Sequence, residues 1–204
     1  IKEININQIN NDGNTILHKD IVLKNNELAL LLIDFGADPT ILDKEGKSFL
    51  FYCISEGIKN ISVLQKVVLL GYDINSKNGQ NKTLLMESIN CYLHTPKDNV
   101  EIKNSHLEMI KELIHLGINV NALDNNNETL LFILVRHGNR ELLHLFLETN
   151  KMNLNYQNNQ DETPLLLMAL NGIKNADLIK LFLEKGANPD LKNQMGKSII
   201  EILV

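Results

Sequence analysis

A hydroxyl residue followed by a run of apolar residues recurs along the chain. One such run, Pro164 to Ala169, follows Thr163. A serine or threonine at this place is typical of a helix N-cap, where the side-chain oxygen accepts a hydrogen bond from a backbone N–H of the first turn. The apolar run predicts a short, buried helix. The hydroxyl residues are Thr15, Ser48, Thr83, Thr129, Thr163 and Ser198.

A second apolar segment lies between most pairs of successive hydroxyl residues and ends at a glycine. Examples are residues 26–35 before Gly36 and residues 61–70 before Gly71. Glycine is favoured at the C-terminal end of a helix because it adopts the left-handed conformation without steric cost. In the fourth interval Asn150 replaces the glycine, and asparagine tolerates this conformation better than most residues. The pattern therefore predicts two helices in each interval.

The two markers repeat in phase. Most hydroxyl residues are about 33 to 35 positions apart, and the helix start Thr163-Pro164-Leu165 and the loop Gly186-Ala187-Asn188 each have blurred copies in other intervals. This resembles the ankyrin repeat, in which each unit is a turn and two helices. The resemblance covers essentially the whole chain. It implies an all-α ankyrin-repeat solenoid of paired antiparallel helices with short β-hairpin loops.

The resemblance predicts a single domain, residues 1–204, built of successive repeats. Repeats of this kind contact only their neighbours, so we expect one continuous, elongated stack. Residues 1–9 are interpreted as the tail of a preceding repeat, because Asn5-Ile6-Asn7 matches Asn119-Val120-Asn121. The predicted repeats are 10–42, 43–77, 78–123, 124–157 and 158–191, with a partial terminal repeat at 192–204.

The third repeat carries an insertion at residues 92–104. Pro96 interrupts the helical pattern there. Insertions in repeat proteins lie in loops, often on a binding face, whereas the alternative is a tolerated surface loop, since added loop length costs little free energy. Because the segment is not poor in apolar residues, we expect an ordered or partly helical excursion beside Arg136 and His137. Its deletion is expected to leave the melting transition largely intact and to weaken partner binding.

Composition narrows the class of partner. The formal net charge is -5 at pH 7, which argues against nucleic acid, whose phosphates need a basic surface. No apolar run approaches the roughly 18 residues of a membrane span, so we do not expect a membrane partner. We expect the protein to be a monomer. Cys53 and Cys91 lie in different repeats without a disulfide framework. A reduced, cytoplasmic location is the default, and a secreted effector delivered to a host cell is the alternative.

Catalytic chemistry finds little support in the sequence. Cys91, His94, His106 and His115 are spread along two predicted helices, whereas a zinc site needs four converging ligands. Gly196-Lys197-Ser198 resembles only the tail of a phosphate-binding loop and is interpreted as a turn and an N-cap. We therefore expect a protein that is not an enzyme and that holds no cofactor or metal.

The resemblance assigns roles to individual residues. It implies that His18 bridges backbone groups of neighbouring repeats. It also implies that partners contact the hairpin tips and the exposed face of the first helices, where Arg136 and His137 are the strongest hot-spot candidates. Any single one of these residues can equally be an ordinary solvated side chain. The candidates, including Tyr92 from the insertion, are Lys44, Glu45, Lys47, Ser55, Glu56, Gln80, Lys82, Asn90, Tyr92, Asn125, Asn126, Glu128, Arg136, His137, Asn159, Gln160, Glu162 and Asn171.

The expected function is a protein–protein interaction module that binds a protein partner through the hairpin tips and the concave inner-helix face. The first alternative is a targeting or specificity domain of a larger enzyme, effector or toxin, whose catalytic part lies outside these residues. A purely structural spacer is the second alternative.

Overall fold

The structure is a computed structural model that describes residues 5–19, 24–55, 60–172 and 176–204. Two compact units, Ile1–Asn119 and Val120–Val204, are distinguished. The first contains the 3-10 helix η1 (Ile16–His18) and the α-helices α2 (Asn26–Asp34), α3 (Phe49–Ser55), α4 (Ile61–Leu69), α5 (Leu84–His94) and α6 (Val100–His115). The second contains α7 (Leu130–His137), α8 (Arg140–Glu148), α9 (Pro164–Leu170), α10 (Ala176–Glu184) and α11 (Ile199–Leu203).

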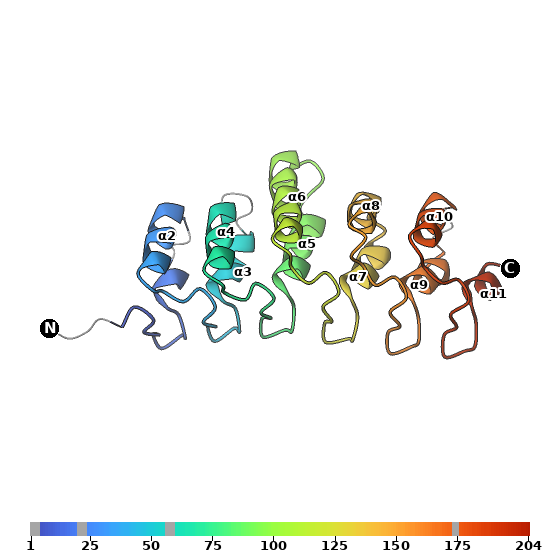
Figure 1. Ribbon diagram of the computed structural model, residues 1–204, viewed down its shortest axis with the longest axis horizontal. Coiled ribbons are helices and arrows are strands. Elements are labelled where there is room, and N and C mark those ends of the chain that lie inside the picture. The colour runs from blue at the N-terminus through green and yellow to red at the C-terminus, as the bar shows by residue number, and fades with distance from the viewer. Residues whose placement is uncertain (1–4, 20–23, 56–59, 173–175) are drawn as a thin grey trace. The chain divides into compact units, whose positions relative to one another are not determined.

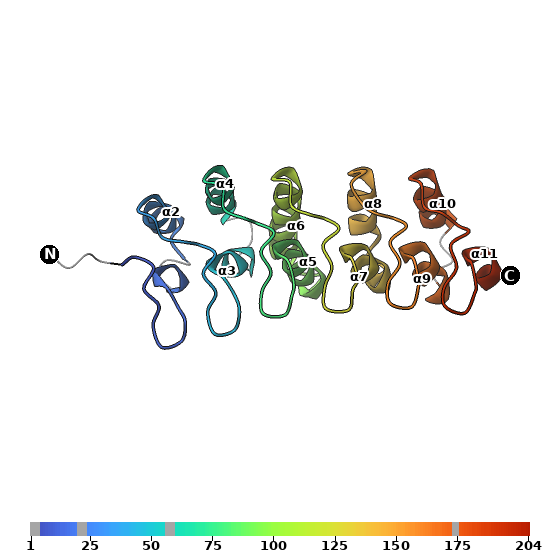
Figure 2. The same ribbon diagram turned by 60° about the horizontal axis from the view of Figure 1, so that its bottom comes forward.

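Within each unit the helices form pairs that lie side by side in chain order (Figure 1). In the first unit α3 packs on η1 and α5, while α4 packs on α2. In the second unit α9 packs between α7 and α11, and α10 packs on α8. A second view shows the first helix of each pair and the connecting turns on one side of the second helices (Figure 2). Each repeat therefore contacts its neighbours of the same unit, as expected for a repeat protein.

The helices begin where the hydroxyl residues predict. Thr15, Thr83, Thr129, Thr163 and Ser198 occupy N-cap positions. Thr83 Oγ1 accepts from the Met86 N–H at 3.3 Å, and Thr163 Oγ1 accepts from the Leu166 N–H at 3.1 Å. Each such bond satisfies one of the backbone donors that a helix start leaves unpaired. The repeat phase inferred from the sequence is thus confirmed at the level of individual caps.

The core consists mainly of leucine side chains. Leu131 is 0% and Leu165 1% exposed, and Leu50 and Leu85 stand at the same place in their repeats and are equally buried. Full burial of such a side chain contributes about 1.5–3 kcal/mol to folding. The C-terminal ends of the second helices also follow the prediction. Asn150 has a φ of 52° at the place where Gly117 has 83° and Gly186 has 97°.

The insertion of the third repeat lengthens two helices. The helices α5 and α6 have 11 and 16 residues, whereas α3 and α4 have 7 and 9. Only residues 95–99, which include Pro96, lie between α5 and α6. The prediction of an ordered, partly helical insertion is therefore confirmed. Its position beside Arg136 and His137 involves both units and remains a prediction.

Burial of Tyr92 corrects the view that the insertion is dispensable. The side chain is 1% exposed and continues a stripe of buried residues on α5 that includes Leu85 and Ile89. Lys103 on α6 places its Nζ 4.8 Å from the centre of the Tyr92 ring. Deleting residues 92–104 would remove this buried ring, so we no longer expect the melting transition to survive the deletion unchanged.

The predicted hairpin loops are tight turns. Single antiparallel bridges join Leu42 to Ser48, Lys77 to Thr83 and Leu123 to Thr129. In the described part of the chain these bridges do not extend into strands. The fold is all-α, as predicted.

Candidate functional site

A six-residue turn precedes the first helix of each repeat. The side-chain Oδ1 of its opening residue accepts hydrogen bonds from the N–H groups two and four positions later. For Asn158, these donors are Gln160 and Glu162, both at 3.0 Å. The N–H of Asn158 also donates to the Glu162 carbonyl at 3.0 Å. The opening residues are Asn10, Asp43, Asn78, Asp124, Asn158 and Asn193.

The fourth residue of each turn has a left-handed backbone. Asn81, Asn127 and Asp161 have φ values of 59°, 58° and 57°, and glycine occupies this place in the other turns. Asparagine and aspartate visit this conformation more readily than other side chains. The first and fourth residues thus fix the backbone. The second and third residues are exposed in every turn, and the fifth projects from most turns but is buried at Glu128. We call these projecting side chains the turn tips.

The turn tips of the first unit are mainly charged. Lys44 and Glu45 are exposed, and Lys47 is half-buried with its Nζ 3.1 Å from Glu45 Oε2. The next turn approaches so closely that the Gly79 N–H donates to the Gly46 carbonyl at 2.8 Å. A Cβ at Gly46 would lie 2.5 Å from the Gly79 Cα, so this contact requires glycine. Lys44, Glu45, Lys47, Gln80 and Lys82 are therefore displayed from two adjacent, mutually fixed turns.

The turn tips of the second unit are mainly amides. Asn125, Asn126, Asn159 and Gln160 are exposed. Asn159 Nδ2 donates to the Asn126 carbonyl at 3.3 Å. The Gln160 carbonyl accepts from the Gln194 N–H at 3.1 Å, which connects this turn to the following one. Adjacent turns are again fixed to each other, here through amide side chains as well as backbone.

Arg136 is held in place by a carboxylate. It reaches back from the last turn of α7 and donates two hydrogen bonds to Glu128, one to each carboxylate oxygen. The Asn158 Nδ2 donates at 3.3 Å both to Glu128 Oε1 and to Glu162 Oε2. The hydrogen bond to Glu128 raises the pKa of Arg136. The guanidinium is thus a cation whose orientation is fixed by two parallel hydrogen bonds. The Arg136 side chain nevertheless remains 45% exposed.

Two candidate residues are not available on the surface. Glu128 is 3% exposed because Arg136 and Asn158 cover its carboxylate. Tyr92 is 1% exposed because it lies on the buried face of α5. Both are corrected from contact residues to supporting ones.

The remaining candidates keep some exposure. Ser55, His137 and Asn171 are exposed at the ends of first helices, Asn90 is half-buried within α5, and Glu162 is half-buried beside Asn158. Glu56 lies outside the described residues. In the first unit the structure brings together the charged tips of two turns, and in the second it brings together the amide tips, Arg136 and Glu162.

His18 bridges neighbouring repeats, as the resemblance to ankyrin repeats implies. Its Nδ1 accepts from the Thr15 N–H at 3.2 Å, so Nε2 carries the proton and donates to the Lys47 carbonyl at 3.3 Å. Burial lowers the pKa of His18, although the Lys47 carbonyl and the charge of Asp43 act in the opposite direction. The ring also meets Tyr52 edge-on, with centroids 5.8 Å apart. This histidine holds two repeats together in its neutral form and is a structural residue.

A column of asparagines was not foreseen from the sequence. Asn155 Oδ1 accepts from the Asn188 N–H at 2.7 Å, while its Nδ2 donates to the Gly186 carbonyl at 3.1 Å. Asn121 makes the same pair of bonds with the following repeat, to the Asn153 N–H and the Lys151 carbonyl. The signal is present in the sequence as an asparagine two positions after the loop Asp or Asn. Its role became visible only once the repeats were placed side by side.

Within the described residues, no three His, Cys, Asp or Glu side chains gather in a way that could hold a metal. A search of the same residues finds no helix with the length and apolar character to cross a bilayer. Cys53 and Cys91 are not joined in a disulfide.

Comparison with known proteins shows similarity to ankyrin-repeat proteins. The family described as ankyrin repeats (3 copies) matches residues 99–193. A putative ankyrin repeat protein of Acanthamoeba polyphaga mimivirus is 27% identical over 176 residues, which are 86% of this chain and 20% of that protein. The chain therefore spans about a fifth of this much longer relative.

Solved structures share the fold over most of the chain. The ankyrin repeat domain of Bcl-3, a member of the IkappaB family, superposes with a TM-score of 0.77 at 20% identity, covering 97% of this chain and 81% of Bcl-3. A structure of the Bdellovibrio bacteriovorus endopeptidase Bd0816 in complex with the immunity protein Bd3460 gives a TM-score of 0.61 at 22% identity, covering 87% and 83%. The chain therefore has the ankyrin-repeat fold, and its residues 99–193 match the ankyrin-repeat family.

Proposed function

We propose that this chain binds a protein partner through its turn tips and the exposed ends of its first helices. The observation that carries the proposal is the construction of the turns. In each described turn the first and fourth residues hold the backbone, so that most of the other side chains are displayed from a backbone that is already ordered. A surface that is ordered before binding loses less conformational entropy on association.

The two units offer different chemistry to a partner. In the first unit Lys44, Glu45 and Lys47 give a surface of mixed charge. In the second unit the turn tips are exposed amides, and Glu128 already holds the Arg136 guanidinium in one orientation. Arginine that is immobilised in this way is typical of interface hot spots. We propose Arg136 and His137 as the centre of the contact and the amide tips as its surroundings.

Fold-related proteins support an interaction role. The Bd0816 structure was determined as a complex with an immunity protein, so a chain with this fold takes part in a protein complex there. The 20% coverage of the mimivirus relative favours, as a second candidate function, a specificity module within a larger effector or enzyme. Both candidates require the same binding surface and differ only in what the rest of the polypeptide does.

The test compares two exposed histidines. His137 ends the first helix α7, whereas His144 lies on the second helix α8, away from the turn tips. The wild-type chain is used to capture partners from a cell that contains them, and binding of a captured protein is then measured with purified components. His137→Glu should weaken binding at least tenfold, because it places a negative charge beside Arg136. His144→Glu should leave the affinity within a factor of two.

A second pair of variants tests the first unit. Lys44→Ala removes an exposed turn-tip charge, and Lys111→Ala removes an exposed charge on α6. Circular dichroism verifies that all four variants are folded. If both members of each pair bind equally well, or if the controls are the variants that lose affinity, the contact surface lies elsewhere and the proposal fails.

A further inference from the structure

Two asparagines of the chain are directly followed by glycine. Asn78 opens the turn of the third repeat, and Asn171 ends the first helix of the fifth. Such a pair is reactive, because glycine has no Cβ and its backbone nitrogen can approach the side-chain amide of the preceding asparagine closely. The two pairs lie in opposite surroundings.

The fold restrains both reacting groups of the Asn78–Gly79 pair. Asn78 is 8% exposed, and its Oδ1 accepts from the N–H groups of Gln80 and Lys82, at 3.0 Å each. The Gly79 N–H donates to the Gly46 carbonyl at 2.8 Å, and a Cβ at Gly79 would lie 3.2 Å from the Gly46 Cα. The Gly79 nitrogen can therefore reach the Asn78 amide only if the contact between two adjacent turns opens.

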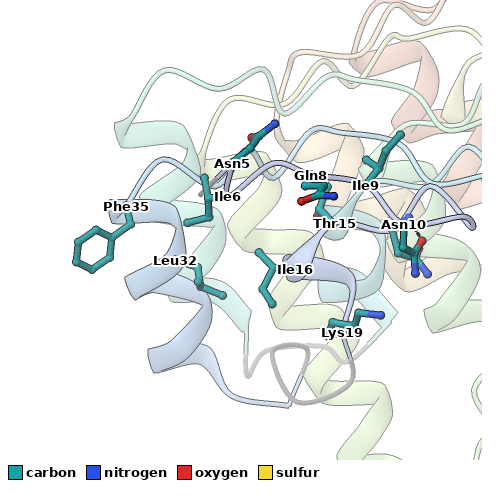
Figure 3. A pocket seen from close by; sticks show the side chains of 11 residues that line it. Asn5, Ile6, Gln8, Ile9, Asn10, Thr15, Ile16, Lys19, Leu32 and Phe35 are labelled. Carbon is teal, nitrogen blue, oxygen red and sulfur yellow. Dashed lines mark hydrogen bonds between the residues drawn. The ribbon is translucent and has the colours of Figure 1, made fainter. Parts of the chain in front are cut away.

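This restraint is a property of the turn and not of the third repeat alone. Asn10, which opens the first turn, lies at the edge of an open pocket in the first unit (Figure 3). Its Oδ1 accepts from the N–H groups of Asp12 and Asn14, at 2.9 Å each. Asn158 makes the same pair of bonds in the fifth repeat. An asparagine that opens a turn is thus restrained wherever it occurs, including at the place where glycine follows it.

The Asn171–Gly172 pair is much less restrained. Asn171 is exposed, and its side chain makes no hydrogen bond to the described residues. The Gly172 N–H donates to the Ala169 carbonyl at 3.0 Å, at the very end of α9. In the described part of the chain, nothing lies within 4 Å of the place that a Gly172 Cβ would occupy. Because a helix end opens at little cost in free energy, this nitrogen is released far more easily than that of Gly79.

We propose that Asn171 is a site of spontaneous deamidation in the folded chain and that Asn78 is not. The Gly172 nitrogen attacks Cγ of Asn171 and forms a succinimide ring. The amide nitrogen of Asn171 takes up the proton that the Gly172 nitrogen loses and leaves as ammonia. Water then opens the ring at either of its carbonyls and gives aspartate or isoaspartate. Water is the co-reactant, and no group is oxidised or reduced.

The reaction changes the surface proposed for binding. Asn171 and His137 occupy equivalent places, because each directly precedes a glycine with a left-handed backbone, Gly172 with a φ of 67° and Gly138 with a φ of 60°. Their helices α9 and α7 pack against each other. Aspartate adds a negative charge beside this candidate contact, and isoaspartate also lengthens the main chain there by a carbon atom. The deamidation itself does not depend on the proposed function, whereas its effect on binding does.

The test follows both asparagines in the full chain. The purified protein is kept in warm, mildly alkaline buffer, and peptide mass spectrometry measures the conversion of each asparagine over time. In the folded chain Asn171 should convert about tenfold faster than Asn78 or more, because only Asn78 must wait for the contact between turns to open. In concentrated urea the two rates should become similar, since both pairs have the same chemistry and neither is then restrained.

Two variants serve as controls. Asn171→Gln should remove most of the ammonia that the folded chain releases, because glutamine has to close a larger and less favourable ring. Asn126→Gln replaces an exposed asparagine that is followed by Asn127 instead of glycine, and it should leave the ammonia release unchanged. Circular dichroism verifies that both variants are folded.

Three outcomes would overturn the proposal. In the first, the folded chain converts Asn78 as fast as Asn171. In the second, Asn171 stays intact in the folded chain over a time in which the chain in urea reacts completely. In the third, the preference for Asn171 persists in urea, which would assign it to the neighbouring sequence and not to the fold.

Discussion

In residues 120–204, Asn121 and Asn155 each use both polar atoms of the amide to join successive repeats. In residues 5–119, Asn7 does the same and Asn75 accepts from the Asn119 N–H at 2.7 Å, but Thr40 stands between them in the column. Its hydroxyl donates to Asp38 Oδ1 at 2.6 Å, within its own repeat. The same repeat pattern therefore allows different contacts between successive repeats. The asparagines hydrogen-bond to the next repeat, whereas the Thr40 hydroxyl bonds within its own, and we expect the contact at Thr40 to stabilise the stack less.

The outer ends of the second helices differ in the apolar surface that they expose. In the second unit Lys185 bonds to Glu148 Oε2 at 3.2 Å and to Asn150 Oδ1 at 3.1 Å, which joins α10 to the end of α8. The equivalent places in the first unit expose Phe35 and Leu69, at 72% and 80%. The first unit also has polar links between second helices, because Lys66 Nζ lies 2.5 Å from Asp34 Oδ1 and Gln65 Nε2 donates to Glu112 Oε1 at 2.7 Å. The units therefore differ in the large apolar side chains that the first leaves in water.

The largest expected effect concerns the long helix pair of the first unit. Tyr92→Ala should lower the free energy of unfolding by about 3–5 kcal/mol, because it empties a site in the core between α5 and α6. Tyr156, half-buried in the second unit, is the matched control, and its replacement by alanine should cost clearly less. Urea denaturation followed by circular dichroism measures both. Equal, small losses would mean that the insertion is a surface loop after all.

A change of a single atom in the amide of Asn158 should have the next largest effect. Asn158→Asp keeps the oxygen that holds the turn but places a carboxylate against Glu128 and Glu162, where the amide donates two hydrogen bonds. We expect a loss of about 1–3 kcal/mol at pH 7. The reverse change Asp124→Asn, at the same place in the preceding turn, should be nearly neutral. A loss as large for Asp124→Asn would show that turn geometry, and not charge, decides.

Exchanging threonine and asparagine at this position of the repeat tests whether the asparagine side chains stabilise the contacts between repeats. Thr40→Asn should stabilise the chain by about 0.5–1.5 kcal/mol if the new amide bonds across to the next repeat, and Asn155→Thr should destabilise it by a similar amount. Hydrogen exchange should show the change at amides of the adjoining loops. If Thr40→Asn lowers the free energy of unfolding, the asparagine at this position does not stabilise the contact between repeats.

The smallest expected effect depends on pH. Burial lowers the pKa of His18 and that of His106, and both lie in the first unit, while His137 and His144 of the second are exposed. Below pH 6.5 the unfolded chain takes up protons that these folded side chains refuse, so stability falls with pH until their lowered pKa values are passed.

The melting temperature should accordingly drop between pH 7 and pH 5. This drop in melting temperature should be smaller in His18→Gln and in His106→Gln than in wild type. In the control variant His144→Gln the drop should equal that of wild type. NMR titration of the ring protons would give the pKa values independently. A drop that is the same in all three variants would assign the acid sensitivity to other groups.

The sequence was sufficient to predict the helices and their caps, because hydroxyl residues, glycines and leucines recur in phase. The resemblance to ankyrin repeats supplied the bridging role of His18. It was insufficient for side chains whose role depends on a neighbouring repeat. Tyr92 was assigned to a surface insertion although its spacing from Leu85 and Ile89 continues a buried stripe. Glu128 was interpreted as a surface charge, because nothing in its local sequence shows that the side chain of Arg136, eight residues later, covers its carboxylate.

The construction of the turns has a consequence for how this chain tolerates sequence change. Two residues of each turn set the backbone, and the tip side chains between them are largely spared that task, so most substitutions there should leave folding intact. The binding surface can therefore change in sequence faster than the residues that determine the fold. A library that varies residues such as Lys44, Asn125 or Gln160 should yield variants that differ in binding but still fold. Gly46 and Gly79 set the boundary of this freedom, because their backbones touch and leave no room for a side chain.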